Sequence, residues 1–455
     1  MSELVATSQQ GLVGKYQPYQ EYKDSGVEWL GNVPSHWTVT AVKRFASFTT
    51  GWTPPTGNDA YFGGEHLWAN ISDVGHRVLS TTAKTITDAG VRATRIKKSP
   101  KGSLLFSFKL SIGLVSIVGE DMYTNEAIAT FLPSETFNIS YMYWAAPLFI
   151  PQNAEENIYG AKLLNQERIG NASFVLPTPK EQQTIAAFLD YETARIDRLI
   201  AQQQRLIELL KEKRQAVISH AVTKGLNPDA PMKDSGVEWL GQVPEHWNVT
   251  KFGFISNVVR GGSPRPAGDP ELFDGDYSPW VTVAEITKDE EVYLESTESF
   301  LTEKGSKQSR VFKRGTLLLS NSGATLGVPK ILSIDANAND GVVGFEKLSV
   351  NTEYAYFYLS TLTDNLRERI KQGSGQPNLN TDIVKSIVIP LPPSGEVEAI
   401  LSEIKTHRIT FSVLISKADT AIKLMQERRT ALISAAVTGK IDLRGWTPPA
   451  EEVAA

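Results

Sequence analysis

Hydrophobic residues recur with a helical period through the middle of the chain, between residues 179 and 224. Ten positions separated by alternate steps of four and three residues include seven apolar ones: Ile185, Leu189, Ile196, Leu199, Leu206, Leu210 and Val217. No Pro or Gly falls between Lys180 and Lys224. A sustained period of about 3.5 residues is typical of a helix that pairs with another helix. The pattern predicts a rod of about forty residues, ~60 Å long at ~1.5 Å per residue.

A second stretch, residues 393–440, carries the same pattern at an offset of 215. The equivalent apolar positions are Ile400, Ile404, Phe411, Leu414, Met425 and Leu432. The polar interruptions also coincide, because Glu192 matches His407 and Lys213 matches Arg428. Two amphipathic helices could each pack on a separate domain. The matched interruptions favour pairing of the two helices with each other, since both helices then occupy equivalent positions in the pair.

The duplication extends beyond the helices. The nine residues K-D-S-G-V-E-W-L-G at 23–31 recur at 233–241, an offset of 210. We interpret this block as structural, a short turn pinned against a core by Trp and Pro. We interpret His36 and His246 as hydrogen-bonded packing residues, because no second ligand lies at metal-binding spacing.

Short apolar runs broken by Gly, Pro and Ser follow each block. They predict many short strands between residues 39 and 175 and again in the second half. The sequence therefore predicts an α+β fold class, in which two β-rich domains alternate with two long helices. The duplication also predicts that the N-terminal block lies beside the end of the second helix, so that the chain ends are close together.

Composition narrows the class of protein. The chain has 455 residues, no Cys and a net charge of -5. It has no apolar run that could span a bilayer and no apparent signal peptide, so we expect a cytoplasmic protein with no membrane partner. The negative charge argues against indiscriminate coating of nucleic acid, but it leaves room for local basic patches.

Catalytic motifs are missing. There is no G-x-x-x-x-G-K-[ST], G-x-G-x-x-G or H-E-x-x-H pattern. We therefore predict a non-catalytic chain that has no cofactor or metal site of its own.

The motifs resemble those of a known family, the specificity subunits of type I restriction–modification systems. The resemblance rests on the two nine-residue blocks, on P-T-P-K-E-Q-Q at 177–183 and on G-S-G-Q-P-N-L-N at 373–380. Residues 392–398 depart from the usual E-E-Q form, which we expect to weaken the capping of the second helix.

The resemblance implies two target-recognition domains separated by two long antiparallel coiled-coil helices, with pseudo-twofold symmetry. Each domain would read one half of a bipartite, asymmetric site in double-stranded DNA. The implied divisions are an N-terminal tail at 1–21, the first recognition domain at 22–178, the central spacer helix at 179–224, the second recognition domain with its linker at 225–392, the C-terminal spacer helix at 393–440 and a C-terminal tail at 441–455.

The resemblance also implies partners. Two methyltransferase subunits would bind S-adenosylmethionine and methylate adenine, and two restriction subunits would use ATP and Mg²⁺ to translocate and cleave DNA. None of these cofactors would bind to this chain.

The residues that would touch DNA are harder to predict. Basic residues close to Trp, Asn and Ser suit phosphate contacts combined with base reading, although a charged face is more often simply solvated. The candidates are polar, basic and aromatic residues in loops that differ between the copies: Trp52, Arg77, Lys84, Arg92, Arg95, Lys97, Lys98, Lys109, Arg260, Arg265, Lys307, Arg310, Lys313, Asn321 and Ser322.

Two other functions are compatible with the patterns. A non-DNA scaffold or adaptor would use the helices only to dock proteins, and it would show no salt-dependent binding to duplex DNA. A nuclease built from scattered carboxylates would cleave DNA in isolation and would need a metal ion.

Overall fold

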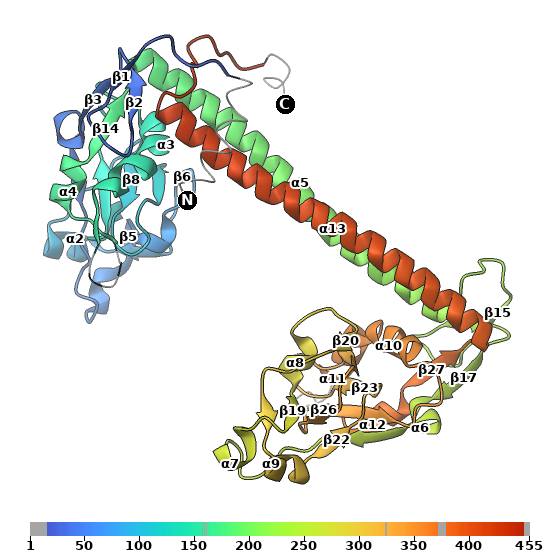
Figure 1. Cartoon of the computed structure of the whole chain (residues 1–455). Helices are drawn as coiled ribbons and strands as arrows, with labels where there is room; N and C mark the ends of the chain where they lie inside the picture. The colour runs from blue at the N-terminus through green and yellow to red at the C-terminus, as the bar shows by residue number, and fades with distance from the viewer. Residues whose placement is uncertain are drawn as a thin grey trace. The chain divides into compact units, whose positions relative to one another are not determined.

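A computed structural model describes residues 16–156, 158, 160, 162–323, 325–371 and 379–449. The chain divides into two compact units. Unit 1 contains the residues up to Gln203 and those from Thr420 onward, and unit 2 contains Gln204–Asp419. Each unit therefore combines one β-rich domain with a part of each long helix (Figure 1).

The two long helices are α5, Pro179–Lys224, and α13, Ser394–Val437. In unit 1 the start of α5 and the end of α13 share one hydrophobic core, and Arg429 Nε lies 2.9 Å from Asp197 Oδ1. In unit 2 the end of α5 shares a core with the start of α13, through Ile218 and Ile400. The helices are therefore paired, as the sequence pattern predicts, and antiparallel, as the resemblance implies.

The pairing seam differs from the predicted one in its middle. The buried isoleucines of α5 are Ile185, Ile196, Ile207 and Ile218, spaced by 11 residues. Leu199 and Leu206, predicted to lie on the seam, are 40% and 42% exposed, and Leu414 of α13 is 42% exposed. The reason is the period. A 3.5-residue template drifts by ~20° per heptad on a straight helix, whereas 11 residues in three turns stay on one face.

The two helices begin differently and end alike. Glu181 accepts hydrogen bonds from the backbone N–H and the hydroxyl of Thr178, which closes a capping box on α5. Pro393 holds the equivalent place before α13 and has no side chain that can cap, so the expected weaker capping is confirmed. Both helices end before a Gly with positive φ, Gly225 at 76° and Gly439 at 71°.

The domain of unit 1 consists of short strands and short helices. Its principal sheet has five strands in the order β4-β11-β8-β9-β6, and a second sheet has the order β10-β5-β7. The elements are β1 Tyr22–Asp24, β2 Asn32–Pro34, β3 Thr38–Ala41, η1 Val42–Arg44, β4 Phe48–Thr50, η2 Asp59–Tyr61, β5 Phe62–Ala69, η3 Ile71–Asp73, β6 Val78–Leu79, β7 Lys84–Ile86, α2 Asp88–Thr94, β8 Leu104–Ser107, β9 Val115–Val118, β10 Tyr123–Thr124, β11 Ile128–Phe131, α3 Ile139–Phe149, η4 Ile150–Asn153, β12 Glu155–Glu156, β13 Lys162–Leu163, α4 Gln166–Asn171 and β14 Ser173–Leu176.

The domain of unit 2 repeats this frame. Its five-stranded sheet has the order β18-β26-β23-β24-β20, and its second sheet has the order β21-β19-β25-β22. The elements are β15 Met232–Asp234, β16 Gln242–Pro244, β17 Asn248–Lys251, α6 Phe252–Ile255, β18 Asn257–Arg260, α7 Pro270–Phe273, β19 Ser278–Val281, α8 Val283–Thr287, β20 Tyr293–Leu294, β21 Phe300–Leu301, α9 Glu303–Gln308, β22 Arg310–Phe312, β23 Leu317–Ser320, β24 Pro329–Leu332, β25 Ala336–Ala338, β26 Val342–Glu346, α10 Thr352–Ser360, α11 Thr363–Lys371, α12 Thr381–Ser386 and β27 Val388–Leu391.

The two five-stranded sheets match strand for strand. In each, the last strand pairs in parallel with its neighbour, β6 with β9 and β20 with β24, while the other pairs are antiparallel. Asn165 caps α4 as Asn380 caps α12. Residues 373–378 of the predicted G-S-G-Q-P-N motif lie outside the described residues.

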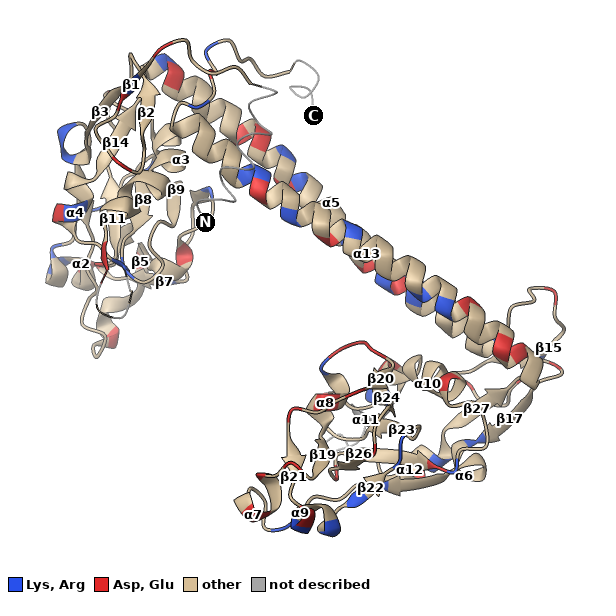
Figure 2. Ribbon diagram, in the orientation of Figure 1, with Lys and Arg blue, Asp and Glu red and all other residues tan. Residues whose placement is uncertain are grey.

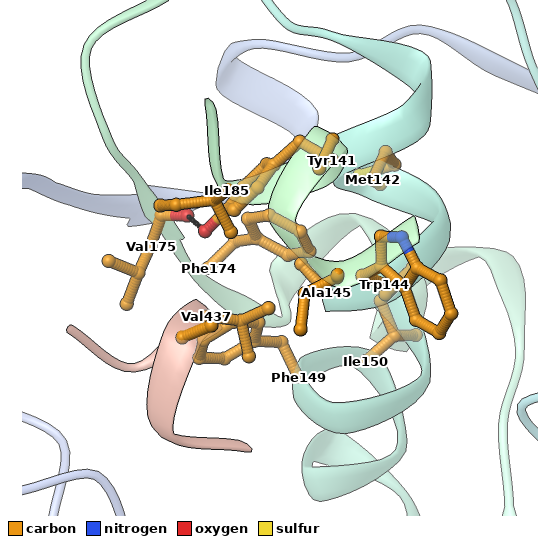
Figure 3. Close-up of a cluster of buried hydrophobic side chains, with 14 of the residues drawn as sticks. Tyr141, Met142, Trp144, Ala145, Phe149, Ile150, Phe174, Val175, Ile185 and Val437 are labelled. Carbon is orange, nitrogen blue, oxygen red and sulfur yellow. Dashed lines mark hydrogen bonds between the residues drawn. The ribbon is translucent and has the colours of Figure 1, made fainter. Parts of the chain in front are cut away.

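The core of unit 1 joins the domain to the helices. Tyr141 is fully buried, and its hydroxyl donates to the carbonyl oxygen of Val175 at 3.0 Å. Ile185 of α5 and Val437 of α13 reach the same cluster (Figure 3). The β-rich domain of unit 1 and the helix ends therefore fold around one core.

The two ends of the described chain meet in unit 1. The Tyr22 hydroxyl donates to the carbonyl oxygen of Gly439 at 3.0 Å, and Lys440 Nζ donates to that of Asn32 at 2.8 Å. This confirms that the N-terminal block lies beside the end of α13.

The folded part is longer than the predicted tails allow. Tyr19, Ile441 and Leu443 are buried, because they add apolar area to the same core. Residues 16–21 and 441–443 therefore belong to the folded unit. The rest of the N-terminal tail, residues 1–15, and residues 450–455 lie outside the described residues.

Candidate nucleic-acid interface

The loops that follow three strands meet at one edge of the first domain. We call residues 51–53, 108–110 and 124–127 the first rim. The Trp52 N–H donates to the carbonyl oxygen of Thr124 at 2.9 Å, and Trp68 Nε1 donates to the carbonyl oxygen of Trp52 at 3.2 Å. A Cβ at Gly51 would lie 1.8 Å from the Thr124 oxygen, so only Gly fits there. This backbone contact leaves the Trp52 side chain 58% exposed.

The loop after β8 completes the first rim. The Phe108 N–H donates to the carbonyl oxygen of Ala127 at 2.9 Å, and the Phe108 ring is buried. Lys109 and Leu110 then project into solvent, and Leu110 is 94% exposed. Thr53 donates to Glu126 at 2.5 Å. The first rim therefore presents an aromatic ring, a cation and a carboxylate together.

The second domain builds the same structure from other side chains. We call residues 260–263, 321–323 and 338–341 the second rim. The Gly262 N–H donates to the carbonyl oxygen of Ala338 at 2.9 Å, and Ser263 donates to Asp340 at 2.6 Å. The Asn321 N–H donates to the carbonyl oxygen of Gly341 at 2.9 Å, as Phe108 does to that of Ala127. Arg260 is exposed, and its Nε donates to the Asp340 carbonyl oxygen at 2.5 Å.

Each rim contains one carboxylate, which the sequence analysis missed. Burial acts to raise the pKa of Glu126, but the hydrogen bond from Thr53 and the charge of Lys109 outweigh it, so the pKa is lowered. The hydrogen bond from Ser263 lowers the pKa of Asp340. Both groups are therefore acceptors at neutral pH, and a carboxylate can accept from the amino group of cytosine. The matched offsets of 210 for Thr53 and Ser263 and 214 for Glu126 and Asp340 were a signal that could have found them.

The predicted basic residues of the first domain form an exposed cluster. We call Lys84, Arg92, Arg95 and Lys97, on β7, α2 and the turn after it, the first basic cluster. Within the described parts of the chain, none of the four has an ion-pair partner within 4 Å, whereas Lys98 Nζ lies 3.7 Å from Asp121. The cluster and the first rim follow opposite edges of one three-stranded sheet.

The predicted basic residues of the second domain are mostly paired. Lys307 lies 2.8 Å from Glu303, Arg310 lies 3.2 Å from Glu346, and Lys313 lies 2.8 Å from Asp335. Arg265 is exposed beside the second rim, and its backbone N–H donates to Gln308. The cations of this domain are thus present, but their charge is partly neutralised.

Three further candidates are partly or fully buried. Asn321 is fully buried, and neither polar atom of its side chain has a hydrogen-bond partner in the described structure. Ser322 is half-buried next to it. Arg77 does not belong to a surface cluster, because it donates to Asp190 of α5 at 2.7 Å and stacks on Tyr143 at 4.1 Å.

The two histidines are hydrogen-bonded as predicted, but both are exposed and not packed in a core. His36 Nε2 lies 2.9 Å from Glu181, which also accepts from Trp37 Nε1 at 3.2 Å. His246 and Trp247 contact Glu396 in the same way, at 2.5 and 2.8 Å. Among the described residues no group of three His, Asp or Glu side chains could hold a metal ion. Within the same residues, no helix combines the length and apolar character needed to cross a membrane.

Comparison with known proteins agrees with this architecture. The family described as "Type I restriction modification DNA specificity domain" matches the chain twice, at residues 34–209 and 244–418. The chain belongs to this family of specificity subunits. The two matches each contain most of one β-rich domain and part of the long helix that follows it.

Individual relatives have low sequence identity to this specificity subunit, but they align with it over most of its length. The MjaIX specificity subunit of Methanocaldococcus jannaschii is 23% identical over 445 residues, covering 94% of this chain and 98% of its own. The EcoBI specificity subunit of Escherichia coli is 23% identical over 323 residues, covering 68% and 66%.

Two solved structures share the fold of this specificity subunit. One is a chain from work on the complex assembly and conformational transition of the type I R-M system, with a TM-score of 0.69, 14% identity and coverage of 89% and 98%. The other is the HsdS subunit of Thermoanaerobacter tengcongensis, with a TM-score of 0.51, 15% identity and coverage of 90% and 98%.

Proposed function

We propose that this specificity subunit binds a bipartite, asymmetric site in double-stranded DNA, one half per recognition domain. The proposal rests on the observation that the first and second rims have the same backbone structure. The backbone contacts of both rims are the same, while the side chains they present differ, with Trp52 and Lys109 in one and Arg260 and Ser322 in the other. A repeated frame with different side chains is suited to reading two different sequences.

Different residues would supply the affinity for DNA and the reading of its sequence. The first basic cluster has exposed, unpaired cations, which suit contacts to phosphates. The rims combine acceptors, donors and an exposed aromatic ring, which suit base edges. We propose that the cluster positions the first domain and that the rim reads the bases.

The long helices would set the separation of the two half-sites. Helix α5 has 46 residues, which corresponds to ~69 Å at ~1.5 Å per residue. A rigid spacer would favour half-sites on one face of the duplex, at separations close to multiples of ~34 Å.

We further propose that the chain is itself non-catalytic and recruits the subunits that act on DNA. Two methyltransferase subunits would supply S-adenosylmethionine-dependent adenine methylation, and two restriction subunits would supply ATP- and Mg²⁺-dependent cleavage. The exposed apolar side chains of the helices support protein docking. In unit 2 they include Leu206, Leu209, Ile409 and Val413, between 42% and 67% exposed.

The decisive experiment maps methylated adenine across the genome of a host that expresses the neighbouring methyltransferase with and without this chain. We expect a split motif that appears only when the chain is present. If the partners are soluble and no chain-dependent motif appears, the proposal fails. A chain that then also shows no salt-dependent binding to duplex DNA would be a scaffold.

A further inference from the structure

The nine-residue block that occurs twice is a surface loop in both units. We call residues 23–31 and 233–241 the first and second loops. Part of their identity follows from the turn itself. Leu30 and Leu240 are buried, and Gly26 and Gly236 have positive φ values of 69° and 70°. Asp24 accepts from the Gly26 N–H at 2.9 Å, and the second loop repeats this bond.

Three identical positions are not explained by the turn. Lys23, Glu28 and Trp29 are exposed in the first loop, and Trp29 is 42% exposed even though its ring lies 5.6 Å from that of Phe149. Neither Lys23 nor Glu28 has an ion-pair partner in the described structure. In the second loop Glu238 is exposed, while Lys233 and Trp239 are half-buried.

Positions beside the loops have diverged. Exposed Asn32 corresponds to exposed Gln242, and half-buried Ser35 corresponds to exposed Glu245. The DNA-facing rims have diverged as well. Folding does not require identity at exposed positions, because surface substitutions away from specific contacts usually change stability little. DNA reading by two unlike domains does not require it either. A binder that contacts both loops in the same way does require it.

We infer that the two loops dock two copies of one and the same protein, one copy per loop. The inference rests on the proposed function, in which the methyltransferase is present twice. Trp29 and Trp239 would be the anchors, since Trp is enriched at the energetic centre of interfaces. A base and an acid, Lys23 and Glu28, flank the anchor and would fix its orientation.

The second loop also borders a hollow. A cavity of about 350 Å³ is lined by Glu238, Trp239, Leu362, Leu366 and Ile383, among others. Among the described residues its lining is mostly apolar, and Glu238 supplies a carboxylate beside the polar Asn365 and Ser386. The partner would therefore present an apolar side chain beside a cation, with an acidic group nearby for the lysine.

The experiment is native mass spectrometry of the chain co-expressed with the neighbouring methyltransferase. We expect two methyltransferases on the wild-type chain, one on Trp29→Ala and none on Trp29→Ala/Trp239→Ala at concentrations near the wild-type Kd. Each loss should correspond to roughly thirty-fold weaker binding at that loop.

A second pair of variants avoids the packed tryptophans. Lys23→Glu/Glu28→Lys and Lys233→Glu/Glu238→Lys exchange charges within each loop and should also remove one methyltransferase each. The matched control is Asn32→Gln/Ser35→Glu, which places second-loop neighbours beside the first loop and should retain both copies. DNA binding by each variant chain alone should equal that of the wild type, which checks folding.

The outcomes separate the two ideas. If the wild type binds two methyltransferases and all loop variants do so with unchanged affinity, the docking inference is wrong and the proposed function stands. If the wild type binds no methyltransferase, both fail.

Discussion

Each recognition domain forms an ion pair with a long helix, and the sign of the charge on the helix differs between the two units. In unit 1 the domain supplies the cation, and Arg77 and Trp144 Nε1 both donate to Asp190 of α5, at 2.7 and 2.8 Å. In unit 2 the domain supplies the acid. Lys405 of α13, at the position equivalent to Asp190, lies 2.8 Å from Glu353 of α10.

The two domains also differ in net charge. Residues 22–178 contain 13 Lys and Arg and 13 Asp and Glu, whereas residues 225–392 contain 16 and 22. Much of the excess lies between residues 269 and 303, with 11 acidic residues and one Lys, along the segment from α7 to β21 (Figure 2). The first domain thus keeps free cations, and the second neutralises most of its own.

The comparison teaches which features a duplicated frame retains. Strand order, capping Asn residues and rim contacts are retained because backbone geometry allows few alternatives. A charged pair needs only its own partner, so the charge on the helix can differ between the copies when a different domain residue of opposite charge faces it. We call the contact of Arg77 with Asp190 the first seat and the contact of Glu353 with Lys405 the second seat. Exchanging the two domains would place Arg77 against Lys405 and Glu353 against Asp190, which are pairs of like charge.

The largest expected effect is on DNA binding by the first basic cluster. Arg92→Ala/Arg95→Ala/Lys97→Ala should weaken binding to duplex DNA on the order of 100-fold and lower the slope of log K against log[salt] by up to ~3. The measurement is a titration of labelled DNA at several salt concentrations.

The matched control in the second domain is Lys307→Ala/Arg310→Ala/Lys313→Ala. These cations already neutralise acids, so we expect less than half of the change in slope. Equal effects of the two triple variants would show that the paired cations exchange their partners for phosphates, and the contrast between the domains would not hold.

The second-largest effect is expected on stability at the first seat. The substitution Asp190→Lys introduces the residue found at the equivalent position of α13, Lys405, and places it against Arg77. We expect a loss of about 2–3 kcal/mol in the free energy of unfolding of unit 1, because two hydrogen bonds to a charged group are lost. Denaturant unfolding followed by Trp fluorescence measures it. Arg77→Glu/Asp190→Lys should recover part of the loss; no recovery would mean that the charges do not determine the seat.

The sequence predicted most of the frame and less of the site. The offset of 215 between the helices and the paired nine-residue blocks were sufficient for the duplication, the pairing of the helices and the meeting of the chain ends, and the family resemblance implied the antiparallel direction. These features depend on residue identity along the chain, which a sequence displays directly.

The remaining features depend on distances that one sequence does not display. Arg77 looked like any other basic loop residue, but the fold brings it to Asp190, 113 residues away. Glu126 and Asp340 are missing from the candidates because these were drawn from basic, aromatic and uncharged polar residues. Leu206 was assigned to the seam because a 3.5-residue template was extended over a helix that follows an 11-residue repeat.

A smaller effect is expected at the second seat. Glu353 accepts from the Tyr293 hydroxyl at 2.6 Å as well as from Lys405. Glu353→Ala should cost unit 2 about 1–2 kcal/mol. Glu353→Gln should cost less, because an amide oxygen still accepts from Tyr293. Thermal unfolding of the two variants compares them. If Gln is as costly as Ala, the charge of Lys405 rather than the tyrosine contact carries the interaction.

The smallest effect concerns the pH dependence of the contacts between the domain and the helices in unit 2. Burial acts to raise the pKa of Glu353, but the bonds from Lys405 and Tyr293 outweigh it, so its pKa is lowered from 4.5. The hydrogen bond from Arg214 likewise lowers the pKa of Glu290. A group with a lowered folded-state pKa stabilises the fold above its unfolded-state pKa, and this stability is lost as the pH falls through the folded-state value.

Glu290→Gln/Glu353→Gln removes both titrating groups. We expect the variant to be less stable than the wild type at pH 7 by about 1 kcal/mol or less, the range of partly exposed ion pairs. The difference should shrink as the pH falls below 4.5, because the wild-type carboxylates become protonated and lose the same bonds. Melting curves of both proteins between pH 7 and 3.5 measure it. A difference that stays constant over this range would mean that the two carboxylates act in these contacts by shape and not by charge.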